Sequence, residues 1–158
     1  MKFLPLILIA GLTGLSLYST AAASPEKGLE IANELDKRDT GFKDSTSTMV
    51  MVLSDQHGQS TQRAIRNRTL EGSSEGDLSL VIFDSPGDVR GTAFLSHTKK
   101  AGSDDQWLFL PALKRVKRIA SSNKAGPFMG SEFAYEDIAS QEVEKYTYNY
   151  LRDEKVNG

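Results

Sequence analysis

The chain has 158 residues, no cysteine, 19 Lys+Arg, 21 Asp+Glu and two histidines. This length suits a single domain, and the lack of cysteine excludes disulfides, thiolate metal sites and cysteine nucleophiles. A formal net charge of −2 provides no field that would attract nucleic acid, so we expect no nucleic-acid partner.

The N-terminal stretch is typical of a secretory signal peptide. A basic start at Met1–Lys2 precedes a mostly apolar run over residues 3–17, and Ala21–Ala23 forms a small-residue cleavage site. The apolar run is shorter than the roughly 20 residues that a membrane span needs, which disfavours the alternative of an anchoring helix. We therefore predict cleavage after Ala23, export to the periplasm, and a mature domain over residues 24–158.

The mature sequence opens with a predicted helix. Ser24 suits an N-cap, Pro25 suits the first turn, and an acidic Glu26 suits the positive end of the helix dipole. Apolar residues between Leu29 and Leu35 give the helix one apolar face, and Gly41 ends it. A helix this short needs another element to pack on.

After the helix, the pattern changes to short strands joined by turns. Such spacing predicts an antiparallel meander. A single helical turn within residues 131–139 and a last strand over 143–151, with Tyr146, Tyr148 and Tyr150 on one face, follow the meander. The strands predicted before them cover residues 47–53, 60–70, 78–83, 91–97, 106–110 and 115–119.

Several of these strands are apolar on both faces, whereas an antiparallel sheet wetted on one side alternates apolar and polar residues. We therefore expect one face to be covered by the helix and the other to line an apolar cavity. Ordinary core packing is the alternative, because cores and apolar pockets use the same residue types. The candidate lining residues are Met49, Met51, Phe83, Phe94, Trp107 and Phe109.

The strongest charge feature is a basic run near the end of the meander. Lys114, Arg115, Lys117 and Arg118 place four cations within five residues. Such a cluster could hold an anionic headgroup, an acidic partner or nucleic acid. The net negative charge disfavours nucleic acid, so we expect contact with anionic headgroups or a membrane partner. The alternative is a solvated edge strand, where lysines discourage edge-to-edge pairing.

The remaining polar residues do not indicate catalysis. His57 falls in a predicted turn and His97 at a strand end, and neither has the Ser/Asp pattern of a triad nearby. The pairs Asp104–Asp105 and Glu136–Asp137 suit a turn and a capped turn. We expect no enzymatic activity, metal or cofactor. A hydrolase that acts on lipid or glycan through these histidines is the least favoured of three hypotheses, after the two non-catalytic ones given below.

Two segments carry a specific motif. They are QWLFLPALKRVKRI over residues 106–119, and GPFMGSEF over 126–133 followed by YED at 135–137. They resemble the periplasmic outer membrane lipoprotein-sorting protein family, a LolA-like group, and the similarity covers roughly residues 28–158. The resemblance implies a mainly β fold with α (α+β), an antiparallel half-open β-barrel with an N-terminal helix and an apolar cavity.

The resemblance also implies a function. Related proteins carry acyl chains of lipids or lipoproteins across the periplasm toward the outer membrane, and members of this group associate with inner-membrane exporters of the resistance-nodulation-division (RND) type. Peripheral membrane contact fits this picture. The alternative is a non-catalytic periplasmic accessory subunit of such an exporter, without a ligand of its own.

Family members are longer than this chain, which ends at Asn157–Gly158. Asn-Gly is a strong signal for a hairpin turn. We therefore expect a truncated chain whose half-barrel is incomplete at the C-terminus and whose last strand is an exposed edge.

Overall fold

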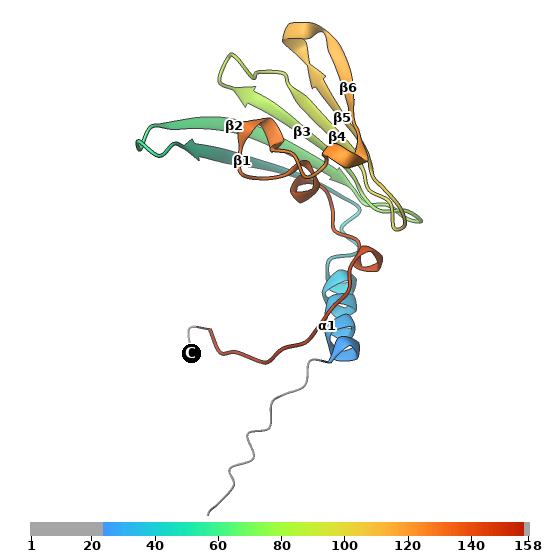
Figure 1. Ribbon diagram of the computed structural model, residues 1–158. Coiled ribbons are helices and arrows are strands. Elements are labelled where there is room, and N and C mark those ends of the chain that lie inside the picture. The colour runs from blue at the N-terminus through green and yellow to red at the C-terminus, as the bar shows by residue number, and fades with distance from the viewer. Residues whose placement is uncertain (1–23, 157–158) are drawn as a thin grey trace, which may run out of the picture.

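The computed structural model describes residues 24–156 (Figure 1). The predicted signal peptide over residues 1–23 and the turn signal at Asn157–Gly158 lie outside the described residues. Within the described range, every helix is too short or too polar to cross a lipid bilayer.

Helix α1 spans Pro25–Arg38, as the sequence predicts. The Ser24 hydroxyl accepts a hydrogen bond from the Lys27 backbone N–H at 3.3 Å and so caps the first turn. Beyond the helix, Gly41 adopts a φ of +91°, a conformation that glycine takes without the steric cost of a Cβ. The helix itself ends before Gly41, where the N–H of the C-cap residue Asp39 donates to the Leu35 and Asp36 carbonyls.

Six strands form one antiparallel sheet in which neighbours in sequence are neighbours in space. The first and last strands do not pair with each other, so the sheet stays open and, with α1, forms the predicted α+β half-barrel. The strands are β1 (Asp44–Ser54), β2 (Ser60–Leu70), β3 (Leu78–Ser85), β4 (Ala93–His97), β5 (Asp105–Leu110) and β6 (Arg115–Ile119).

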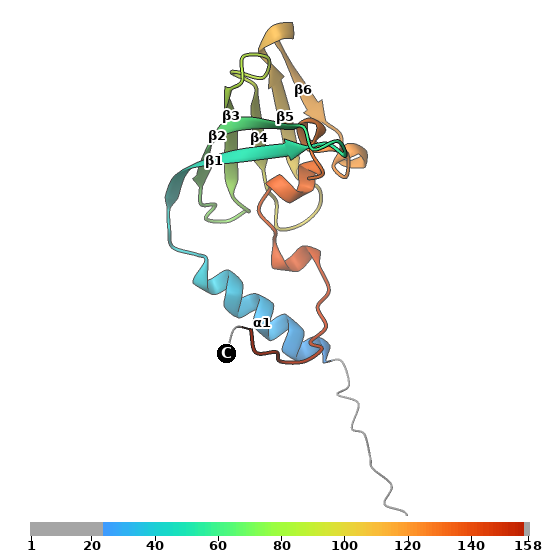
Figure 2. The ribbon, with the colours of Figure 1, turned by 90° about the vertical axis from the view of Figure 1, so that its left-hand side faces the viewer.

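A β-bulge bends the sheet. Ile65 of β2 pairs with Phe83 and Ala64 pairs with Ser85, which leaves Asp84 as an extra residue in β3. Bulges increase the bend and twist of a strand locally. In Figure 2 the β1–β2 hairpin crosses in front of the later strands, so the sheet has an inner, concave face and an outer, convex face.

The core lies on the concave face and is largely aromatic. Residues 120–138 return across this face after β6 and place Phe128 between the sheet's Phe83 and Phe94. The Phe128 ring centroid lies 5.3 Å from that of Phe94 and 5.9 Å from that of Phe83. All three side chains are essentially fully buried, and Tyr135 packs beside them. The chain itself therefore covers the concave face.

Helix α1 does not cover either face of the sheet. Figures 1 and 2 both show it beyond one end of the sheet, beside the C-terminal segment. Its one buried residue is Gly28, where an added Cβ would lie only 2.9 Å from the backbone nitrogens of Asn149 and Tyr150. Leu29 and Leu35 are 45% and 70% exposed, so the expectation that the apolar face packs on the sheet is wrong.

The strand predicted over residues 143–151 is absent. The segment forms a short 3-10 turn at Val143–Lys145 and then runs extended, with a single bridge from Tyr150 to Ser24. The tyrosine alternation has the strand period, but this segment lies beside α1 rather than beside a strand edge. A strand forms only when its backbone bonds to a neighbouring strand. Within the described residues, this segment has one such backbone bridge, from Tyr150 to Ser24.

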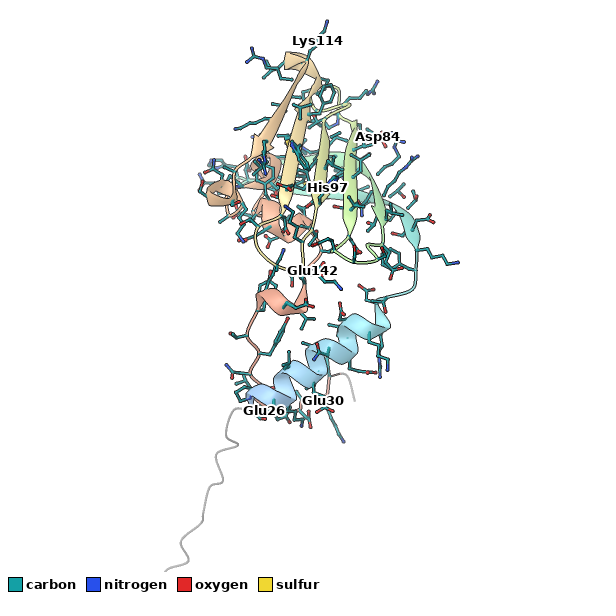
Figure 3. All side chains as sticks on the ribbon, turned by 90° about the vertical axis from the view of Figure 1, so that its right-hand side faces the viewer. Glu26, Glu30, Asp84, His97, Lys114 and Glu142 are labelled. Atoms are coloured by element: carbon teal, nitrogen blue, oxygen red, sulfur yellow. The ribbon has the colours of Figure 1, made fainter. Side chains whose placement is uncertain are left out.

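A buried glutamate lies where the chain passes from the sheet toward the helix. Glu142, labelled in Figure 3, is 9% exposed, and its carboxylate makes no hydrogen bond or ion pair with the described residues. Burial, and then the nearby carboxylate of Asp77, raise the pKa of Glu142 above its usual value of 4.5. The folded state therefore favours the protonated side chain.

The first prediction concerns the buried ring of Phe128. We expect Phe128→Ala to lower the free energy of unfolding by about 3–5 kcal/mol, because it removes a fully buried ring and leaves a cavity. The matched control is Phe133→Ala, since Phe133 is 54% exposed in the same loop. Denaturant unfolding measures both, and equal losses in the two variants would show that Phe128 is not the core residue described here.

The second prediction concerns Glu142. Because its folded-state pKa is raised, the stabilisation it provides is complete below the unfolded pKa and is lost as the pH rises through the folded pKa. Glu142→Gln should therefore raise the melting temperature at about pH 7 and leave it nearly unchanged at about pH 3.5. Glu144→Gln, which makes the same charge change at an exposed neighbour, is the control. A pH-independent effect of Glu142→Gln would contradict the assignment.

Candidate functional site: a groove at the rim of the concave face

The motif over residues 126–133 forms a closed loop. Pro127 and Ala134 form a β-bridge, and the Phe128 N–H donates to the Phe133 carbonyl at 2.6 Å. We call residues 127–134 the plug loop, because they place Phe128 in the concave face. The motif thus specifies a compact structural unit.

The turn of the plug loop is held by a polar side chain and by unusual backbone conformations. Met129 and Gly130 have φ values of +52° and +76°, in the left-handed region. The Ser131 hydroxyl donates to the Phe128 carbonyl at 2.7 Å. From the sheet, the Arg63 guanidinium donates to the Met129 carbonyl at 2.6 Å. These bonds tie the plug loop to β2.

A groove of about 460 Å³ lies between the plug loop and the β1–β2 hairpin. This volume falls in the range of ligand pockets. Met51 and Leu53 supply apolar walls from β1, and the half-exposed ring of Phe133 faces them from the plug loop. The other lining residues are Val52, Ser54, Asp55, Gln59, Ser60, Thr61, Gly130, Ser131 and Glu132.

The strand register divides the predicted lining residues between the two faces of the sheet. Met49 and Met51 lie on the concave side, with Phe83 and Phe94 buried there in the core. Trp107 and Phe109 alternate with the concave-facing Leu108 and therefore lie on the convex side. A single cavity lined by all six residues is thus wrong. Of the six, only Met51 lines the groove.

The convex face is apolar over its central strands. The register places Leu80, Leu95 and Trp107 in one cross-strand row. A shallow depression of about 350 Å³ includes Leu80 and Leu95, with Leu70 and Leu78. Helix α1 lies beyond one end of the sheet and the plug loop lies on the concave side, so neither covers the convex face. Figure 3 labels two polar residues of this face, Asp84 and His97. Residues 120–138 therefore cover the concave face, and the expectation that the helix covers one face of the sheet is wrong.

The predicted basic run forms the end of the β5–β6 hairpin. Arg118 pairs with Asp105, which also binds the Lys99 ammonium at 2.7 Å. Hydrogen bonds from Lys99 and then Arg118 lower the pKa of Asp105. Lys114, Arg115 and Lys117 are exposed and form no ion pair within the described residues. Three of the four predicted cations therefore have no intramolecular partner there.

The polar residues that raised the question of catalysis have structural contacts. The His57 N–H donates to Asp55 Oδ1 at 2.8 Å in an exposed turn, and the His97 ring packs against Trp107 with centroids 5.0 Å apart. Glu136 pairs with Lys124 at 3.0 Å. Within residues 24–156, no group of three or more His, Asp or Glu side chains could hold a metal ion.

The carboxylates of Asp104 and Asp137 bind backbone. Asp104 accepts the Lys99 N–H at 2.9 Å and pairs with Lys145, and Asp137 accepts the Ala134 N–H at 2.7 Å. The predicted capped turn is therefore confirmed at Asp137, whereas Asp104 closes the loop before β5 and Asp105 is the first residue of that strand.

Sequence reasoning missed two groove residues, Leu53 and Phe133. Leu53 continues the alternation of Met49 and Met51, and that period could have identified it. Phe133 lies inside the quoted motif, but no local signal distinguishes it from Phe128. The separation of the two rings depends on the fold of the plug loop.

Comparisons with known proteins agree with this architecture. A crystal structure from Vibrio parahaemolyticus, of a domain provisionally named as an outer membrane lipoprotein-sorting protein, is 59% identical with a TM-score of 0.82. A DUF1329 family protein from Desulfovibrio piger is 33% identical with a TM-score of 0.77. Each match covers 85% of this chain and 57% of the solved chain. This chain therefore spans little more than half the length of these relatives.

A family model whose description reads "Uncharacterized protein" matches residues 75–158. No curated protein matches the chain. One of the two solved structures, that from Vibrio parahaemolyticus, carries the name that the sequence motifs resemble, and its match covers 85% of this chain. The chain is therefore similar in sequence and in fold to a domain provisionally named as an outer membrane lipoprotein-sorting protein and to a DUF1329 family protein.

Proposed function

We propose that this protein is a periplasmic carrier that binds the acyl chains of lipids or lipoproteins and transfers them toward the outer membrane without enzymatic chemistry. The observation that carries the proposal is the groove between the β1–β2 hairpin and the plug loop. One relative's name, which refers to lipoprotein sorting, supports the choice of cargo.

The physical requirement of a carrier is to shield methylene groups from water, at about 0.8 kcal/mol for each one buried. Met51, Leu53 and Phe133 offer apolar surface at the groove, and methionine adapts its shape to irregular apolar partners. The rigid aromatic core beneath the groove limits how deeply an acyl chain enters. The groove therefore suits one end of an acyl chain.

The partners follow from the same proposal. A carrier must receive cargo at one membrane and release it at another, so we propose an inner-membrane exporter of the RND type as donor. The export of the chain to the periplasm is part of this proposal.

A second function has two observations in its favour. Phe128 fills the deepest part of the concave face, and the apolar convex face is uncovered within the described residues. These features suit a non-catalytic accessory subunit that docks on an exporter through its convex face and carries no ligand. Under this alternative, lipid extraction of the purified protein recovers no acyl ligand, and Phe109→Asp abolishes co-purification with the exporter.

The third prediction tests the carrier. Met51→Asp should weaken binding of a fluorescent fatty-acyl probe by about tenfold or more, because it places a charge in the apolar wall of the groove. Val50→Asp is the matched control, since Val50 is the next residue along β1, faces the convex side and is 61% exposed.

Titration with the fluorescent probe measures the binding affinity of each variant, and mass spectrometry of lipids extracted from the purified protein identifies any bound ligand. A wild-type protein that binds no probe and yields no lipid would contradict the carrier function. Equal weakening by the two substitutions would contradict the placement of the acyl chain in the groove.

A further inference from the structure

The end of the β5–β6 hairpin carries apolar side chains in contact with water. Leu113 is 63% exposed and Val116 is 65% exposed. A 3-10 turn over Pro111–Leu113 and a left-handed Lys114 make the reversal. In Figures 1 and 3 this hairpin end projects from the sheet on the side away from α1. It is therefore accessible to a large flat partner.

The same hairpin end has an uncompensated positive charge. Lys114, Arg115 and Lys117 are exposed and unpaired within the described residues. The sequence contains no acidic residue between Asp105 and Glu132. This local charge contrasts with the net charge of −2 on the whole chain. The register places Val116 on the convex side of the hairpin and Arg115 and Lys117 on the concave side, so cations and exposed apolar side chains share the same hairpin end.

The pairing of protruding apolar side chains with cations restricts the partner. A soluble anion would satisfy the cations but gains nothing from Leu113. An anionic bilayer satisfies both, because cations bind lipid phosphates and apolar side chains enter the interface between headgroups and acyl chains. Basic residues can also keep their charged ends at the surface while their methylene stems lie deeper.

We propose that the end of the β5–β6 hairpin, residues 110–118, is a docking site for an anionic lipid membrane. Leu113 and Val116 enter the interfacial region, and Lys114, Arg115 and Lys117 contact the lipid phosphates. This docking goes beyond the acyl-carrier function and does not depend on the groove, which lies at the β1–β2 hairpin.

The fourth prediction is a vesicle sedimentation experiment with the purified chain. The wild type should bind vesicles of phosphatidylcholine mixed with phosphatidylglycerol, bind phosphatidylcholine alone weakly, and lose binding at high salt. Lys114→Gln, Arg115→Gln and Lys117→Gln together should weaken binding by about fivefold for each cation removed. Leu113→Ser with Val116→Ser should weaken it by about tenfold or more.

Matched controls separate the hairpin from the rest of the surface. The charge control is Lys37→Gln, Lys43→Gln and Lys100→Gln, which removes three exposed lysines elsewhere. The apolar control is Leu35→Ser on α1, where Leu35 is 70% exposed. Both controls should bind vesicles like the wild type. Because every substituted side chain is exposed, unchanged circular dichroism is expected for all variants and confirms that they are folded.

A spectroscopic readout tests insertion directly. The chain has no cysteine, so Leu113→Cys can be labelled at one site with a polarity-sensitive dye. The dye emission should shift to the blue on anionic vesicles, whereas a dye at Leu35→Cys should not shift. The variant Met51→Asp should keep vesicle binding even if it loses the acyl probe, which distinguishes membrane docking from cargo binding.

Three outcomes would overturn the proposal. The first is a wild-type chain that does not bind anionic vesicles. The second is retained binding in the triple-glutamine variant. The third is a loss of binding in that variant without any effect of the Leu113/Val116 substitutions or any dye shift, because that result would indicate a purely electrostatic site for another anion.

Discussion

The packing of Phe128 between Phe83 and Phe94 is the contact that fills the concave face of the sheet and on which the described core depends. The meander itself consists of strand pairs close in sequence, and a curved sheet with one bare apolar face would not be stable in water. By returning over the concave face, residues 120–138 convert that sheet into a packed core. The bond from Arg63 to the Met129 carbonyl holds the plug loop in register with β2, and the groove exists because the loop stops short of the β1–β2 hairpin.

The two faces of this sheet differ in what covers them, and this difference organises the surface. The concave face is covered by the chain, while the leucines of the convex face are covered by nothing within residues 24–156. The ion pairs of Asp84 and Asp105 with Arg66 and Arg118 lie on the convex side and border its apolar centre. These charged side chains of the convex face are therefore paired, whereas Lys114, Arg115 and Lys117 at the end of the β5–β6 hairpin have no ion-pair partner within the described residues.

The helix, the strands and the turn chemistry could be predicted from the sequence, because capping residues and short-range alternation act locally. The face assignment could not. Strands that are apolar on both sides give no indication of which side is inward, and so Met51 and Trp107 were expected in one cavity. The segment after Val143 failed for a related reason: its tyrosine alternation satisfies the period of a strand, but pairing depends on which neighbour the fold provides. The family resemblance identified the architecture, whereas the role of Phe133 required the folded loop.

The bulge at Asp84 has a consequence for how such domains diversify. One additional backbone residue, rather than any lining side chain, determines where β3 turns and hence how far the β1–β2 hairpin leans over the plug loop. Related domains could thus widen or narrow their groove by inserting or deleting a residue at this point, without changing the side chains that line it. Cargo size and cargo chemistry would then evolve as separate properties, one through strand length and the other through side chains.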